Sequence, residues 1–394
     1  MLDWLIVGGG IHGTNLSLYL TRRKQISAER VRVLDPHAAP LTLWERHTGN
    51  TGMEFLRSSH AHNLHFDPFS LVTFARTQVG EKLARFVESY SRPSLELFQA
   101  HSAHLIERYQ LDRLRIQGRA LGLKRLGDGW RVETADGGIE ARNIIVAIGN
   151  TENPFWPDWA MALREAGALV QHVFQTGFKR ENLPAWEQMV VVGGGITAAQ
   201  TAMTLSMQQP GTVTLLMRHA ARIHHFDSDP VWIDGRQLQP FHSTDDYSQR
   251  RAIIAEARHR GSMPPDVARD LGTAVAGGLM SVREDTIVGT EFSPSPTGKQ
   301  NITFQLGSGD NLNSDWVILA TGFSPVRPGG EWLDNAIHEY NLPIAPDGYP
   351  IVDPSLCWAD GLYVSGPLAE LEVGPVSRNF IGVRLAAERI GATL

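Results

Sequence analysis

Two short glycine-rich stretches in this sequence have the spacing needed to bind phosphate groups through backbone NH groups. The first follows an apolar run, residues 2–7, and precedes an apolar pattern with helical spacing. In a strand–turn–helix of this kind, the first glycine permits the turn, the second lets the backbone approach a pyrophosphate, and the third lets helix and strand pack closely. We therefore predict a dinucleotide site at this turn. Its predicted contacts are Gly8, Gly10, Ile11, His12 and Gly13.

An acidic residue follows this turn at the distance that a ribose site requires. The next apolar strand, residues 31–34, ends at Asp35, which stands 22 residues after Gly13. A carboxylate at this point of a dinucleotide fold accepts hydrogen bonds from the ribose hydroxyls. We predict that Asp35, with the adjoining Pro36, contacts the ribose of the first dinucleotide.

The same pattern recurs in the middle of the chain. An apolar run, residues 189–192, leads into a second glycine turn, with alanine at the third position, which the motif permits. The following strand ends at Arg218 and not at a carboxylate. An arginine there suits a 2′-phosphate and favours NADPH over NADH; the alternative is a solvated charge at a strand end. The predicted contacts are Gly193, Gly195, Ile196, Ala198, Arg218 and His219.

Two such turns predict an α/β protein with two Rossmann-like dinucleotide-binding domains, the second inserted into the first. We expect the first domain at residues 1–153 plus 320–394 and the second at 154–319, with a helical insertion at about 224–275 that covers the active site. Within the first domain, residues 82–110 read as a helical stretch and residues 118–138 as a β-hairpin. Two buried strands end in Ala-x-Gly segments. Their predicted cofactor contacts are Ala147, Gly149, Thr321 and Gly322.

The composition restricts the class of partner. The 394 residues carry a net charge of −6 without blocks of like charge, so neither nucleic acid nor a polybasic membrane contact is supported. Cys357 is the only cysteine, which excludes an internal disulfide and a CxxC redox pair. No signal peptide or membrane-spanning run of about 20 apolar residues is visible. We expect a cytoplasmic protein with a small-molecule substrate, and the oligomeric state is left open.

These landmarks together resemble the flavin and pyridine-nucleotide oxidoreductases that contain two dinucleotide-binding domains, in which the first motif holds FAD and the second NAD(P)H. Several segments are similar to the class B flavin monooxygenases, in particular the N-hydroxylating branch that acts on lysine or ornithine. The residues that carry this likeness are Trp44 with 52–58, including Met53, then 68–71, 170–174 and 226–230.

The resemblance implies an FAD-dependent, NADPH-using oxidoreductase. Within this branch it implies a monooxygenase that hydroxylates a small molecule with O2 through a flavin C4a-peroxide. Two alternatives stay open. One is an NAD(P)H-dependent flavin electron-transfer reductase without oxygen insertion, and the other is a non-catalytic nucleotide-binding redox sensor.

Three polar residues are the candidates for a catalytic role beside the flavin: Arg57, His65 and His172. The histidines at 60–65 could also suggest a metal site, but their spacing suits neither one strand face nor one helix face, so we predict no metal. Near the C-terminus, Gly366 and Pro375 precede a helix whose N-terminal NH groups could face the flavin.

Overall fold

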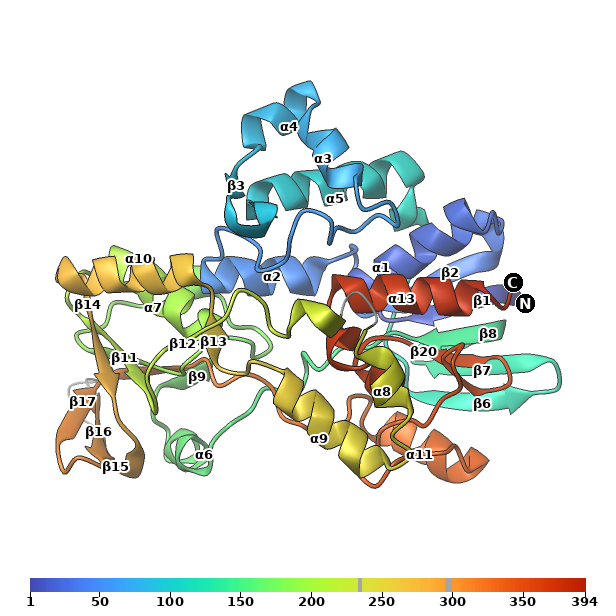
Figure 1. Ribbon diagram of the computed structural model, residues 1–394. Coiled ribbons are helices and arrows are strands. Elements are labelled where there is room, and N and C mark those ends of the chain that lie inside the picture. The colour runs from blue at the N-terminus through green and yellow to red at the C-terminus, as the bar shows by residue number, and fades with distance from the viewer. Residues whose placement is uncertain (233–235, 295–299) are drawn as a thin grey trace.

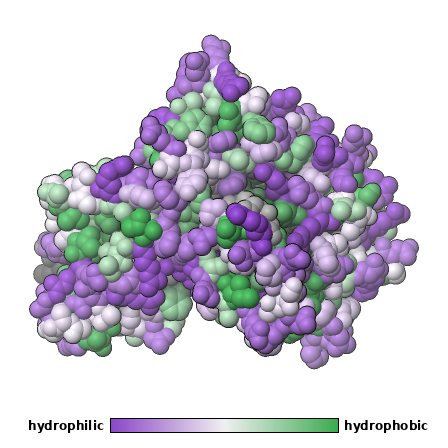
Figure 2. Space-filling view, in the orientation of Figure 1, coloured by the Kyte–Doolittle hydropathy of each residue, from purple (hydrophilic) through white to green (hydrophobic). Residues whose placement is uncertain are grey.

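The structure, a computed structural model, describes residues 1–232, 236–294 and 300–394. Two lobes lie side by side, each built on a parallel β-sheet, and the two chain termini lie next to each other at the outer end of the first lobe (Figure 1). The visible face carries mainly hydrophilic side chains, with hydrophobic ones in scattered groups (Figure 2). This arrangement confirms the predicted fold class, α/β with two Rossmann-like cores.

The first lobe contains a sheet with the strand order β19-β20-β8-β1-β2-β5, in which all pairs except β19–β20 are parallel. Its buried strands consist of apolar runs, as a parallel sheet covered on both faces requires. A hairpin, β6–β7, pairs with β8 and confirms the β-hairpin predicted at residues 118–138. The bounds are β1 (Leu2–Val7), β2 (Val31–Asp35), β5 (Arg115–Gln117), β6 (Gly122–Leu126), β7 (Gly129–Thr134), β8 (Gly137–Val146), β19 (Cys357–Ala359) and β20 (Leu362–Val364).

Helices α3, α4 and α5 of the first lobe build the upper part of the molecule in Figure 1, whereas α11 lies at its lower edge. Helix α1 packs against α13, and both contribute to the largest core cluster. The bounds are α1 (Ile11–Leu18), α2 (Thr42–Thr51), α3 (Ser70–Ala75), α4 (Gln78–Leu83), α5 (Leu95–Tyr109), α11 (Glu331–Tyr340), α12 (Glu370–Val373) and α13 (Phe380–Gly391).

The expected helical stretch at 82–110 is wrong in its first half. Helix α4 ends at Leu83, and the chain then forms the short strands β3 (Phe86–Val87) and β4 (Arg92–Pro93) before α5 begins. The physical reason is Pro93, which lacks an NH group for a helix interior. Ser94 then caps α5 by accepting a hydrogen bond from the Leu97 NH group.

The second lobe contains a parallel sheet with the order β14-β11-β10-β18-β9. Helices α7 and α10 pack with its strands in one core cluster, whereas α6 and an antiparallel sheet, β15–β17, pack with them in another. The bounds are α6 (Asp158–Glu165), β9 (Val170–His172), β10 (Met189–Val192), α7 (Ile196–Gln208), β11 (Val213–Met217), α10 (Pro265–Ala276), β14 (Met280–Glu284), β15 (Ile287–Pro294), β16 (Gln300–Leu306), β17 (Asn311–Ser314) and β18 (Trp316–Leu319).

The first sheet draws its strands from residues 2–146 and 357–364, and the second from residues 170–319. This order is compatible with a second domain threaded into the first. The exact limits, 1–153 plus 320–394 and 154–319, stay a prediction.

The expected insertion consists of two short helices and a small parallel ribbon, β12–β13. Phe241 and Ile254, from the two helices, pack into the core of the first lobe. Helix α10 differs from the expectation, because it packs on α7 and leads into β14. Residues 233–235 of the insertion lie outside the described residues. The bounds are β12 (Arg222–Ile223), α8 (Leu238–His242), α9 (Tyr247–Ala257) and β13 (Ser262–Met263).

Candidate functional site

The first glycine turn has the backbone geometry of a dinucleotide site. Gly8 has a φ of +110°, and a Cβ built on it would lie 2.6 Å from the carbonyl oxygen of Ala147. A Cβ on Gly13 would lie 1.7 Å from the Gly8 carbonyl oxygen, so only glycine allows the helix to approach the strand. A Cβ on Gly10 would meet no described atom within 4 Å. The backbone at Gly10 is therefore open to a ligand.

Asp35 ends β2 beside this turn, as its position in the sequence predicted, but it already has partners. Its carboxylate accepts a 2.6 Å hydrogen bond from the Gly9 NH group and a 2.8 Å bond from the His37 NH group. It also forms a 3.1 Å ion pair with Arg115, whose side chain is 5% exposed. Arg115 lies against the turn, since a Cβ on Gly9 would be 2.2 Å from its Nη1. The carboxylate that would face a ribose is thus fixed and paired.

His12 connects the first turn to the C-terminal segment. Its Nδ1 lies 2.8 Å from the Ser365 hydroxyl oxygen, and a Cβ on Gly366, which has a φ of +70°, would lie 3.6 Å from its ring. Burial lowers the pKa of His12 to about 4, because the protein interior penalises the charged imidazole. His12 is therefore neutral at physiological pH. Gly366 lies where the C-terminal segment meets the phosphate-binding turn.

The second glycine turn has a similar backbone conformation, but other residues pack against it. Gly193 has a φ of +154°, a Cβ built on it would lie 2.5 Å from the Ala320 carbonyl oxygen, and Ala198 is fully buried. A Cβ on Gly195, the counterpart of Gly10, would lie 3.2 Å from the Gly261 Cα atom and 3.7 Å from the Ser262 carbonyl oxygen. The backbone beside β13 therefore covers the position that a pyrophosphate would approach.

Basic side chains surround this second turn. Arg218 follows β11 and is exposed, and the ring of His219 would lie 3.1 Å from a Cβ on Gly194. His224 and His259 stack with ring centroids 3.7 Å apart. Arg218 supplies positive charge on this surface, whereas burial and the neighbouring His259 lower the pKa of His224. This arrangement agrees with the prediction that Arg218 and His219 face a nucleotide, without testing it.

Arg57 contacts the insertion and not a cavity. Its guanidinium lies within hydrogen-bonding distance of the carbonyl oxygens of 224–226, of the Ser262 carbonyl oxygen and of the Ser262 hydroxyl, at 2.6–3.4 Å. Burial lowers the pKa of Arg57 to about 10, so the side chain stays charged at physiological pH. With its donors occupied in this way, Arg57 is suited to positioning the insertion.

His172 lies at the end of β9 with no exposed surface. Its Nδ1 accepts a 3.1 Å hydrogen bond from the Phe174 NH group, and Nε2 has no partner in the described part of the chain. The ring of His47, from α2, lies 4.8 Å from that of Phe174, and its Nε2 is likewise without a partner there. Burial lowers the pKa of both histidines to about 4. Two neutral imidazoles thus meet between the lobes.

His65 lies in a different place. Its Nδ1 accepts a 2.9 Å hydrogen bond from the Asp67 NH group, and its ring packs 4.0 Å from that of Phe66. Burial lowers its pKa. No contact joins Arg57, His65 and His172 to one another in the described residues, so the structure does not bring the three predicted catalytic residues together.

The other predicted cofactor residues line the two turns and the crossings between the lobes. The Ala147 carbonyl oxygen contacts the first glycine of the first turn, and that of Ala320, the residue before the predicted Thr321, contacts the first glycine of the second turn. The Thr321 hydroxyl donates to the Phe155 carbonyl oxygen, and Trp44 packs 4.9 Å from the ring of Phe98. The remaining ones are Ile11 and Ile196 at the starts of α1 and α7, Pro36 after β2, Met53 after α2, Gly149, Gly322 and Pro375.

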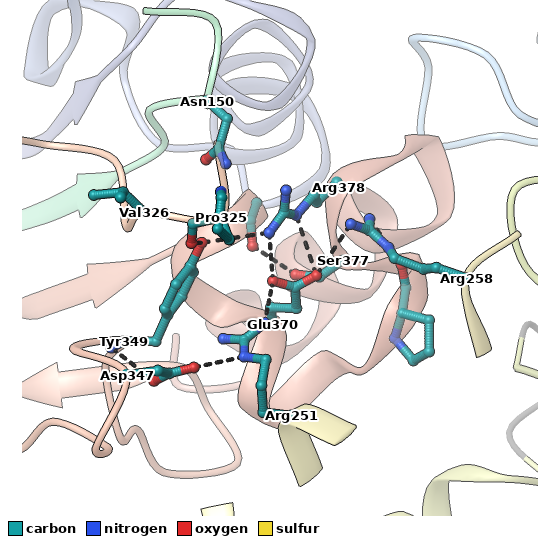
Figure 3. Close-up of polar contacts among 12 residues, drawn as sticks. Asn150, Arg251, Arg258, Pro325, Val326, Asp347, Tyr349, Glu370, Ser377 and Arg378 are labelled. Carbon is teal, nitrogen blue, oxygen red and sulfur yellow. Dashed lines mark hydrogen bonds and ion pairs between the residues drawn. The ribbon is translucent and has the colours of Figure 1, made fainter. Parts of the chain in front are cut away.

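Sequence reasoning missed the charged network around Glu370, which joins the insertion to the first lobe (Figure 3). Glu370 is 1% exposed and pairs with Arg251 at 2.7 Å, Arg258 at 3.3 Å and Arg378 at 2.7 Å. Burial alone would raise the pKa of Glu370, but Arg258 and Arg378 bring it down to about 2. Arg378 also reaches the Tyr349 hydroxyl. A charged carboxylate therefore anchors α9 beside the start of α13.

One signal could have found Glu370. The sequence lacks the acidic residue usual after the glycine of the last FAD strand, and Glu370 is the first acidic residue after Gly366. Nothing in the sequence marks Arg115 or Gly261, because their importance depends on β5 pairing with β2 and on the ribbon reaching the second turn. In the described part of the chain, no three His, Cys, Asp or Glu side chains are grouped so as to hold a metal ion.

Two family models match parts of the chain. Residues 5–151 match the FAD-NAD(P)-binding family, and residues 128–268 match the L-lysine 6-monooxygenase/L-ornithine 5-monooxygenase family. Over these residues the chain is similar to flavin-dependent N-hydroxylating monooxygenases. The predicted resemblance, the oxidoreductase class and the binding of FAD and NAD(P) are confirmed.

Similar structures extend over the whole chain. The reduced ornithine hydroxylase of Pseudomonas aeruginosa is 20% identical with a TM-score of 0.74, covering 100% of this chain and 98% of that one. The L-lysine 6-monooxygenase of Pseudomonas syringae is 18% identical with a TM-score of 0.73, covering 100% and 99%. The "uncharacterized oxidoreductase CzcO" of Bacillus velezensis is 21% identical over 338 residues, 82% of this chain and 81% of that protein. At these identities the structures show a shared fold.

Proposed function

We propose that this chain is a monooxygenase that uses FAD and NADPH to insert one oxygen atom of O2 into a small molecule, and that a nitrogen atom of an organic amine is the first substrate class to test. The observation that carries the proposal is the family match over residues 128–268, because this range contains both the second turn and the ribbon with helices α8 and α9. The proposed location is the cytoplasm.

The first turn fits FAD. Gly8 and Gly13 let the turn pack closely, Gly10 leaves room for a pyrophosphate at the start of α1, and Asp35 lies where the ribose would be held. When bound, FAD supplies hydride acceptance and the reaction with O2. The sequence of the second turn matches the motif for NADPH. In this structure the backbone of Gly261 lies beside Gly195, where a pyrophosphate would approach.

The protein's own contribution is to exclude water and to position neutral polar groups. Helix α9 is fixed to the first lobe by Arg251 and the Glu370 network, which closes the site from one side. Phe174 and Phe323 stack at 4.9 Å and form an apolar wall next to His172. Because the pKa of His172 is low and its Nδ1 accepts from the Phe174 NH group, the neutral imidazole carries its proton on Nε2 and can donate a hydrogen bond there without adding charge.

The test is anaerobic reduction of the FAD-loaded protein by NADPH, followed by mixing with oxygenated buffer, with and without lysine, ornithine or cadaverine. Substrate-dependent O2 uptake that yields a hydroxylated amine supports a monooxygenase. Immediate return of the oxidised flavin spectrum with electrons passing to an added quinone supports the reductase instead. Failure of NADPH to reduce the flavin under any condition rules out both enzymes and favours a redox sensor.

A further inference from the structure

The second dinucleotide turn is closed by the backbone of the same chain. A Cβ on Gly195 would lie 3.2 Å from the Cα atom and 3.5 Å from the carbonyl carbon of Gly261. The absence of a side chain at this position is what lets a pyrophosphate approach such a turn. In this structure Gly261 takes that space, and the nearby Ser262 carbonyl oxygen would repel a phosphate. A pyridine dinucleotide that approaches Gly195 would therefore meet this segment.

The covering segment is a small unit with few internal hydrogen bonds. It consists of β12 and β13, which pair in parallel over two residues each, and we call it the ribbon. The His224 NH group donates to the Met263 carbonyl oxygen at 3.0 Å. Gly261, with a φ of +68°, turns the chain into β13 and brings its backbone over the second turn. Ser262 and Met263 are buried, and Met263 packs in the core of the second lobe, so opening of the ribbon withdraws β13 from that core.

Arg57 of the first lobe contacts both ends of the ribbon. Arg57 donates to the carbonyl oxygens that follow β12 and, at Ser262, to both the carbonyl and the hydroxyl oxygen of β13. The next residue toward the N-terminus, Leu56, is fixed, because it is buried and its NH group donates to the Pro93 carbonyl oxygen. Tyr90 packs on the same side, 5.0 Å from the ring of His225.

We propose that the ribbon is a gate over the second dinucleotide turn and that Arg57 is a positioning residue that holds it shut. Lifting the ribbon would uncover Gly195 and, with it, the basic side chains of Arg218 and His219 beside the turn. Binding of NADPH is then reduced by the fraction of molecules in which the gate is open. The inference rests on the proposed use of NADPH at this turn.

The experiment uses the FAD-loaded full-length protein, with NADP⁺ as the probe. Wild type is compared with Arg57→Met, which removes every donor, and with Arg57→Lys, which keeps the charge but offers its donors from one atom. Arg384→Met is the matched control, because Arg384 also donates to backbone carbonyls, those of Ala61 and His65, but not to the ribbon. FAD content and thermal unfolding establish that each variant is folded.

Two readouts are measured, the association rate of NADP⁺ by stopped flow and the hydrogen exchange of the amides at 222–226 and 261–263. If the gate closes as proposed, Arg57→Met binds NADP⁺ about tenfold faster than wild type, Arg57→Lys is intermediate and Arg384→Met is unchanged. Exchange at the ribbon rises in Arg57→Met without ligand, and in wild type only when NADP⁺ is added.

Equal association rates and equal ribbon exchange in wild type and Arg57→Met would overturn the gate. So would the absence of NADP⁺ binding to every variant, because the second turn would then be no nucleotide site at all. These outcomes differ from a failure of the proposed function, in which NADP⁺ binds behind the gate but no substrate is oxygenated. If Arg57→Met does not fold, the comparison between wild type and Arg57→Lys tests the gate.

Discussion

Gly10 and Gly195 occupy the same position in two copies of one strand–turn–helix motif, but only Gly10 faces open space. A Cβ on Gly10 would meet no described atom within 4 Å, whereas a Cβ on Gly195 would meet the backbone of Gly261 at 3.2 Å. The backbones of the two turns are otherwise alike, with positive φ at Gly8 and at Gly193. The difference lies in what the rest of the chain places over each turn.

Gly9 and Gly194, the middle glycines of the two turns, also differ in the side chain that packs against them. Arg115 lies against Gly9 and is paired with Asp35, whereas His219 lies against Gly194 with no carboxylate partner among the described residues. The first turn is thus electrically balanced and open, and the second is basic and covered. One motif can therefore give a permanently available site or a gated one, depending on segments distant in sequence.

The largest expected effect comes from neutralising Glu370, which pairs with the insertion that contains the ribbon. Glu370→Gln leaves three arginines around an uncharged, buried amide, and we expect a loss of about 4 kcal/mol in the free energy of unfolding at pH 7. Urea unfolding with excess FAD measures it. Glu152→Gln, at an exposed ion pair with Arg119, should change stability by less than about 1 kcal/mol.

The same anchor predicts a pH dependence. Because the folded pKa of Glu370, about 2, lies below its ordinary value of 4.5, its contribution is complete above pH 4.5 and is lost as the pH falls toward 2. The shift corresponds to about 3 kcal/mol. Wild type should therefore lose more stability than Glu370→Gln between pH 5 and pH 2.5. Parallel losses in the two proteins would show that Glu370 does not anchor the insertion.

The third position of each turn offers the next contrast. Gly13→Ala would place a methyl group 1.7 Å from the Gly8 carbonyl oxygen, so we expect a destabilisation of about 3 kcal/mol and loss of bound FAD. Ala198→Gly, the mirror change in the second turn, should cost about 1 kcal/mol and keep FAD. Flavin absorbance after gel filtration and urea unfolding test both variants. Retention of FAD by Gly13→Ala would mean that close packing at α1 is not required.

The turns themselves were predictable from the sequence, because each of their features is local. A buried run, three spaced small residues and a helical pattern are enough to place Gly8, Gly13 and Gly193, and the strand that follows each turn places Asp35 and Arg218. The same holds for the hairpin β6–β7, where turn residues separate two short strands. Local steric rules govern all of these positions.

The cover of the second turn was not predictable, because it depends on contacts between distant segments. Arg57 meets the ribbon across 167 residues or more, and Glu370 meets Arg251 across 119. Nothing in the residue types near Gly261 indicates that its backbone reaches Gly195. The predicted catalytic residues also lie apart: Arg57 binds the ribbon, while His65 and His172 lie in separate packing environments, and their catalytic roles stay a prediction.

A smaller effect is expected where a methyl group fills the open turn without disturbing the protein. At Gly10 the φ of −73° is available to alanine and no described atom is near, so Gly10→Ala should leave the stability of the FAD-free protein unchanged. FAD affinity should fall about thirtyfold, which is about 2 kcal/mol. Flavin fluorescence titration measures it. Gly272→Ala, an exposed glycine of α10 with equal free space, is the control and should bind FAD normally.

The smallest effect concerns the charge beside the covered turn. Arg218 is exposed, so a contact to a 2′-phosphate would be solvent-screened, and Arg218→Ala should weaken NADPH binding about fivefold, or about 1 kcal/mol, while NADH binding is unchanged. The ratio of the two dissociation constants is the measurement, with Arg269→Ala on α10 as an exposed-arginine control. An unchanged ratio would identify Arg218 as a solvated charge at a strand end. The preference for NADPH would then have to come from His219 or from the ribbon itself, and the difference between the two turns would lie in their cover alone.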